Sequence, residues 1–124
     1  MESVEHGWDP VAERVALSDD TFRRANEGIA ATSIALGIDG LLPFICECAN
    51  TKCTAMLRLT REEYEAVRRE PTHFLIVQGH EHVAEGWAIV VATHARYAVV
   101  AKIGDAAVIT EQRDPRRQEA HGPT

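Results

Sequence analysis

The chain has 124 residues, with 13 lysines and arginines against 19 aspartates and glutamates, which gives a net charge of −6 when histidine is neutral. Apolar residues make up 45% and charged residues 26%; these values exclude collagen-like, coiled-coil and wholly disordered chains. The acidic balance also argues against a broad phosphate-binding surface, because counterion release needs clustered lysine and arginine, so we expect no nucleic-acid partner.

Nothing in the sequence is typical of a membrane segment or a secretion signal. No apolar run approaches the roughly 20 residues needed to cross a bilayer. The first residues, Met1 to His6, lack the basic and apolar regions of a signal peptide. The three cysteines lie within eight residues, unlike the disulfide framework of a small secreted protein. We therefore expect a cytoplasmic protein that does not contact a membrane.

The first third of the chain predicts helices. Asp9 is suited to cap a short helix that has Pro10 in its first position. A longer helix is expected over residues 19–36, with Ser18 as its N-cap and Gly37 as the left-handed residue after its end. Residues 1–17 then form an N-terminal arm. The buried side of the long helix is predicted to be an apolar stripe of Phe22, Ala25, Ile29, Thr32 and Leu36.

A capping box marks a second helix. Residues 55–59 alternate loosely and predict a short strand. Thr60 and Glu63 have the spacing at which each side chain bonds the other residue's backbone amide, which starts a helix. This helix should end at Glu70, because Pro71 disfavours the helical conformation of the residue before it.

The C-terminal half predicts a small, mostly antiparallel sheet. Apolar runs at 74–77, 87–92 and 97–102 have the length of strands, and residues 107–109 add a last edge strand. The segment 85–93 stays open between strand and helix. From residue 111 the composition turns polar and charged, which predicts a flexible tail over 111–124. The expected fold class is α+β, in a single metal-binding domain over residues 18–110.

The cysteines form a C-x-C-x4-C pattern in a loop between the two helices. Residues i and i+2 of an extended chain project to the same side, so Cys46 and Cys48 can point at one centre. Four intervening residues allow Cys53 to fold back toward them. The pattern therefore predicts three thiolate ligands for one metal ion.

A structural zinc takes four ligands, commonly four cysteines or three cysteines and a histidine, and this chain has no fourth cysteine. His80 is the first candidate, because Gly79 allows close approach and the pair follows the strand at 74–77. His82 is the second candidate and His73 the third. We predict one zinc per chain, held by Cys46, Cys48, Cys53 and His80, with the choice between His80 and His82 left open.

Two other uses of the cysteines compete with zinc. An iron–sulfur centre has a compatible ligand inventory, but it ranks below zinc because the chain lacks the downstream C-D-G-x-H element of small iron–sulfur domains. A thiol redox pair of Cys46 and Cys48 has Glu47 between the thiols, which would raise their pKa.

The residues Phe44, Cys46, Glu47, Cys48, Cys53, Glu63, Tyr64, Val67, Arg68, Phe74, Gly79 and His80 follow the pattern F-x-C-E-C, then C, then E-Y-x-x-V-R, then F and G-H. In this pattern the chain resembles a group of small uncharacterised bacterial proteins. The likeness covers about residues 23–102. It implies no activity, and it implies that His80 belongs with the cysteines.

A site closed by four protein ligands leaves no position for a substrate, and the sequence shows no second cluster of convergent polar residues. We therefore expect a non-catalytic zinc-binding module that acts through protein contacts, as an adaptor or regulatory accessory. The helix over residues 19–36 is the candidate surface for a protein partner or a homodimer. The alternative is a small metal-dependent enzyme or a thiol redox sensor that uses the same cysteines.

Overall fold

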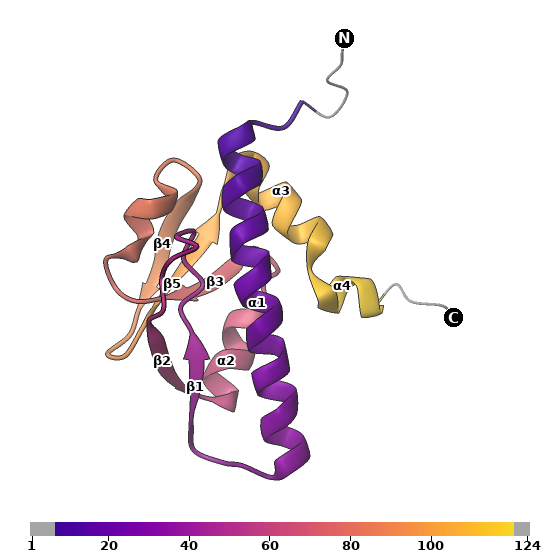
Figure 1. Ribbon diagram of the computed structural model, residues 1–124, viewed down its shortest axis with the longest axis vertical. Coiled ribbons are helices and arrows are strands. Elements are labelled where there is room, and N and C mark those ends of the chain that lie inside the picture. Colours follow the sequence, from indigo (N-terminus) through magenta and orange to yellow (C-terminus); the bar gives the residue numbers. More distant parts are fainter. Residues whose placement is uncertain (1–6, 121–124) are drawn as a thin grey trace.

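The computed structural model describes residues 7–120 and has the α+β fold that the sequence predicts. The long first helix crosses the molecule, with two small sheets on one side of it and the last two helices on the other (Figure 1). In chain order the elements are α1 (Pro10–Leu36), β1 (Leu41–Ile45), β2 (Met56–Thr60), α2 (Arg61–Arg68), β3 (His73–Ile76), the 3-10 helix η1 (His80–Ala84), β4 (Ala88–Thr93), β5 (Ala98–Lys102), α3 (Gly104–Arg113) and α4 (Pro115–Ala120).

α1 is one helix where the sequence predicted two. Asp9 caps it by accepting from the amides of Val11 and Ala12, and Gly37 ends it in the left-handed conformation, as expected. The predicted start of the long helix at residue 19 is wrong. The helix begins at Pro10, inside the segment 1–17 that was predicted to be an N-terminal arm. Ser18 does not cap a helix; its buried hydroxyl donates to the carbonyl of Ala49 at 3.3 Å.

From Ser18 to Ser33 the buried face of α1 is mostly polar, so the predicted apolar stripe is also wrong. Asp19, Arg23 and Asn26 are fully buried, although Leu36 is 68% exposed. Of the predicted stripe, Phe22 and Ile29 are half-buried, and Ala25, Thr32 and Leu36 are exposed. Within residues 7–120 no helix combines the length and the apolar character that a membrane span needs.

Arg23 pairs with Asp20 of the same helix at 2.9 Å, and the other partners of these buried groups come from elements far along the chain. The Arg23 guanidinium donates to the carbonyls of Pro71 and Thr110, at 2.7 and 2.9 Å. Its carbon lies 4.8 Å from the centre of the Phe74 ring. Asp19 forms a fully buried ion pair with Lys102 of β5. The polar face of α1 therefore pairs with β5, α3 and the turn before β3.

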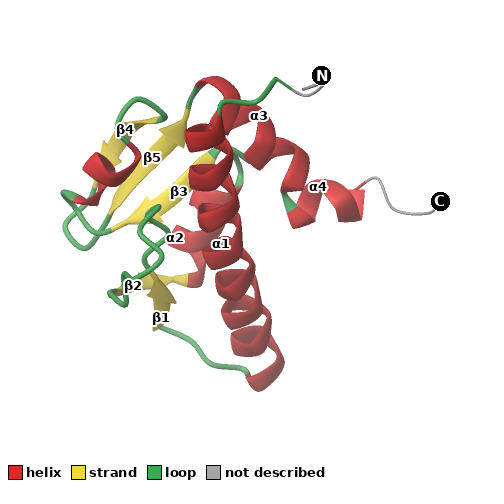
Figure 2. Ribbon diagram, turned by 45° about the horizontal axis from the view of Figure 1, so that its top comes forward, coloured by secondary structure: helices red, strands yellow, loops and turns green. Residues whose placement is uncertain are grey.

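The strands form two sheets, both antiparallel (Figure 2). β1 pairs with β2, which places Phe44 opposite Leu57. The second sheet has the order β3-β5-β4, so β3 and β4 are its edges. The sequence left residues 85–93 undecided between strand and helix. They form a strand from Ala88 onward, and η1 and a turn precede it. A single apolar core joins the two sheets and α2, and it includes Phe44, Tyr64, Phe74 and Val100.

Two helices, α3 and α4, lie where an edge strand and a flexible tail were expected. Residues 107–109 were predicted as an edge strand, but they lie inside α3, where Ala106, Ile109 and Thr110 are buried. Ile109 and Thr110 follow Ala106 by three and four positions, which is the spacing of one helix face. The short apolar run at 107–109 was therefore misread as a strand. The predicted tail is also wrong as far as Ala120, because α3 continues to Arg113 and α4 follows. Residues 121–124 lie outside the described part.

The Asp19–Lys102 pair gives the first prediction. Asp19→Leu leaves a buried ammonium without a counterion, and we expect it to lower the free energy of unfolding by about 3 kcal/mol. Lys102→Met should act similarly, because it leaves a buried carboxylate. The double variant should be less destabilised than the sum of the two, as measured by urea unfolding. Strictly additive effects would contradict the pairing.

Candidate metal centre

Cys46, Cys48, Cys53 and His80 meet at one point. Their ligand atoms all lie within 4.8 Å of one another. The Nδ1 atom of His80 is 3.5 Å from the Cys46 sulfur and 3.8 Å from the Cys53 sulfur. Around a tetrahedral zinc, with bonds of about 2.3 Å to sulfur and about 2.0 Å to nitrogen, neighbouring ligand atoms lie roughly 3.5 to 3.8 Å apart. The group is therefore able to hold a metal ion, and its donors suit zinc.

Backbone hydrogen bonds shape the cysteine loop. The Cys46 amide donates to the carbonyl of Ala55 at 3.0 Å, which extends the pairing of β1 and β2 into the loop. The Cys53 amide donates to the carbonyl of Asn50 at 3.0 Å, and this tight turn folds Cys53 back. Cys46 and Cys48 are buried and Cys53 is half-buried.

His80 reaches the cysteines from the segment after β3. Gly79 has a φ of 94°, a left-handed conformation that a residue with a Cβ atom rarely adopts. The His80 amide donates to the carbonyl of Val77 at 3.0 Å, so the chain turns sharply back at this point. Because Nδ1 faces the sulfurs, it is the nitrogen placed to bind an ion.

The other two candidate histidines lie outside the group. The Nδ1 atom of His82 is 2.6 Å from the carbonyl oxygen of Gly79, and its side chain is exposed. His73 lines a groove with Tyr97 and Val99, between α2 and the second sheet. The structure thus brings His80 to the cysteines and leaves His82 and His73 elsewhere.

Glu47, which the sequence analysis did not select, holds the loop from its other side. Its carboxylate accepts from the Leu75 amide at 3.0 Å and from the side chain of Asn26 at 2.8 Å. Its own amide donates to the carbonyl of Leu75 at 2.8 Å. Glu47 is fully buried, and burial raises the pKa of its carboxyl to about 7. The loop is therefore fixed to β3 and α1 by one residue between two of the ligands.

Asn26 completes this support from the buried face of α1. Its amide group accepts from the Ile45 amide and donates to the Ile45 carbonyl, both at 2.8 Å, while it also donates to Glu47. One signal in the sequence could have identified Glu47. In an extended C-x-C segment successive side chains point to opposite sides, so the residue between the two cysteines faces away from the metal and into the protein. No local pattern marked Asn26.

The spacing of the donors, more than the pKa values of the thiols, separates the competing uses of the cluster. Burial raises the pKa of Cys46 to about 12 and also raises that of Cys48. A redox-active thiol and a zinc ligand are both thiolates, so this shift argues against a reactive thiol pair only where no cation is bound. A cluster of several irons spreads its ligands over several metal atoms, whereas these donors lie within 4.8 Å of one another. The arrangement fits a single ion, whose binding displaces thiol protons.

Comparisons with known proteins found no match: no family model, no curated protein and no solved structure matches the chain.

Glu47→Gln tests the support behind the ligands. Glutamine has one acceptor oxygen, so its amide group must face either the Leu75 amide or the Asn26 amide group, donor against donor. We expect zinc affinity to fall by about tenfold or more, as measured by competition with a chromophoric chelator. Glu62→Gln, which alters an exposed residue of α2, is the control. Equal affinities in the two variants would show that Glu47 does not support the site.

Proposed function

We propose that the protein is a non-catalytic zinc-binding module, in which Cys46, Cys48, Cys53 and His80 hold one structural zinc and the surface makes protein contacts. The observation that carries the proposal is the convergence of four donors within 4.8 Å. A zinc with four protein ligands has no open position for substrate or water, which is typical of structural sites.

The position of the site supports a structural role. The cysteines belong to the loop between β1 and β2, whereas His80 follows β3 of the other sheet. An ion bound there joins the two sheets through segments that are 34 positions apart in the case of Cys46 and His80. Binding free energy at such a site contributes to folding, because the unfolded chain offers no preformed set of ligands.

The exposed end of α1 supports the protein-contact part of the proposal. Ile34 and Leu36 are 61% and 68% exposed, and Ile38 and Leu41 in the following segment are 45% and 44% exposed. These apolar residues lie around the turn from α1 to β1, at one end of the molecule (Figure 1). Such a concentration of exposed apolar side chains is typical of an interaction surface. A partner protein or a second copy of the chain would cover it.

The metal part is tested by native mass spectrometry and elemental analysis of protein purified without chelator or affinity metal. We expect one zinc per chain in the parent. Cys48→Ser should lose the metal and melt at a lower temperature, and His80→Ala should also lose it. His82→Ala is the matched control and should keep it. A metal-free parent that is as stable as a zinc-loaded one would overturn the structural zinc.

Leu36→Glu tests the contact surface. The substitution places a charge in the exposed apolar region without touching the core, so folding and zinc content should stay the same. If the surface mediates self-association, light scattering should show a larger species for the parent and a monomer for the variant. A monomeric parent would exclude the homodimer and leave a different protein as the partner.

A further inference from the structure

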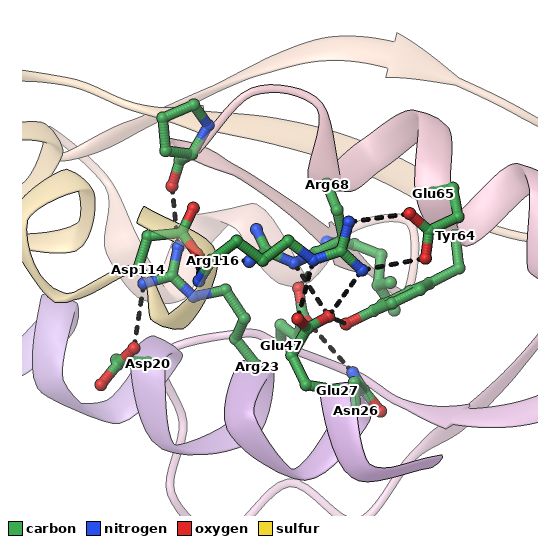
Figure 3. Close-up of polar contacts among 12 residues, drawn as sticks. Asp20, Arg23, Asn26, Glu27, Glu47, Tyr64, Glu65, Arg68, Asp114 and Arg116 are labelled. Carbon is green, nitrogen blue, oxygen red and sulfur yellow. Dashed lines mark hydrogen bonds and ion pairs between the residues drawn. The ribbon is translucent and has the colours of Figure 1, made fainter. Parts of the chain in front are cut away.

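Two carboxylates outside the metal centre hold the guanidinium of Arg116 (Figure 3). Its Nε and one terminal nitrogen donate to Glu27, at 2.7 and 3.0 Å. Its two terminal nitrogens donate to Glu65, at 2.7 and 2.9 Å. The ring of Tyr64 lies 6.0 Å from the guanidinium carbon. Two edges of the planar group are thus paired with carboxylates, which is the strongest and most specific way to bind a guanidinium.

The three receiving residues, Glu27, Tyr64 and Glu65, belong to α1 and α2 and are called the guanidinium clamp below. Contacts that do not involve Arg116 orient the Glu27 carboxylate: it accepts from the Tyr64 hydroxyl at 2.6 Å and from Arg68 at 3.2 Å. Tyr64 is fully buried and its ring stacks on Phe44, with centroids 4.4 Å apart. Tyr64 and the Glu27 carboxylate that it orients are therefore fixed to the core, whereas Glu65 lies at the surface.

The occupant of the clamp, Arg116, belongs to the short helix α4. α4 has six residues, and Asp114 just before it pairs with Arg68 at 2.5 Å. The side chains of Arg116 and Glu65 are 33% and 42% exposed. Solvent therefore reaches the outer side of the clamp, so a guanidinium from outside can compete for the position of Arg116.

We propose that the guanidinium clamp binds an arginine side chain of a partner protein, and that Arg116 fills it within the chain until that partner displaces α4. The inference rests on the proposed role in protein contacts and supplies the chemistry of the partner; it does not depend on the metal. Arginine is selected over lysine because a single ammonium presents a point charge and cannot pair along two edges.

The test uses the 124-residue protein, purified without chelator, and N-acetyl-arginine amide as the probe; NMR shifts of the backbone amides around Glu65 report binding. Arg116→Ala should bind the probe saturably, about tenfold or more tightly than the parent, whose clamp is filled. Arg14→Ala, which removes an exposed arginine of α1, is the control and should behave as the parent. N-acetyl-lysine amide should not bind Arg116→Ala, and adding Glu65→Gln should abolish binding of the arginine probe.

Three results would overturn the proposal: no saturable shift in folded Arg116→Ala, equal binding of the lysine probe, or equal affinity in the parent. Should Arg116→Ala not fold, Arg116→Lys keeps a positive charge but leaves one edge of the clamp unpaired, and the same comparisons apply to it. Zinc content is measured on the same samples. If Arg116→Ala holds one zinc per chain but does not bind the arginine probe, the clamp alone is overturned. If it binds the probe but holds no zinc, the metal centre alone is overturned.

Discussion

The carboxylate of Glu47 is the contact on which the placement of the metal loop depends. β3 is an edge strand, and the backbone of Leu75 would have unpaired groups on its outer side. Glu47 supplies both missing partners, since its carboxylate accepts from the Leu75 amide and its amide donates to the Leu75 carbonyl. One residue thus acts as a neighbouring strand, and the cysteines on either side of it face the opposite way, toward His80.

Buried charge, more than apolar contact, determines how α1 lies against the rest of the fold. Apolar side chains tolerate small shifts, but a buried carboxylate or guanidinium has few acceptable arrangements because leaving it unpaired is costly. Asp19 needs Lys102 of β5, and Arg23 needs the carbonyls of Pro71 and Thr110. These requirements specify one orientation of the helix. They also account for the large share of apolar surface that α1 leaves exposed at its C-terminal end.

What the sequence predicted well were features whose signal is local. The cap at Asp9, the capping box of Thr60 and Glu63, and the C-terminal Gly37 each depend on residues a few positions apart, and the structure has all three. The cysteines are equally local, and the structure groups His80, which follows Gly79, with them. The buried face of α1, α3 and the roles of Glu47 and Arg116 depend on partners distant in the chain. No periodicity of the helix itself reports such partners, so hydrophobicity alone selected the wrong face.

The distance along the chain between α1 and its partners affects how the protein is made. Arg23 bonds Thr110, 87 positions later, and the Asp9 amide donates to Asp105, 96 positions later, at 2.9 Å. During synthesis α1 emerges early, and Asp19 has no counterion until β5 exists, although Arg23 can already pair with Asp20 of the same helix. A nascent chain that stops before β5 lacks the partner of Asp19, so the buried polar face of α1 is only partly satisfied. Complete docking of α1 therefore requires β5 and α3, so we expect interrupted products to be more open to proteases than finished chains.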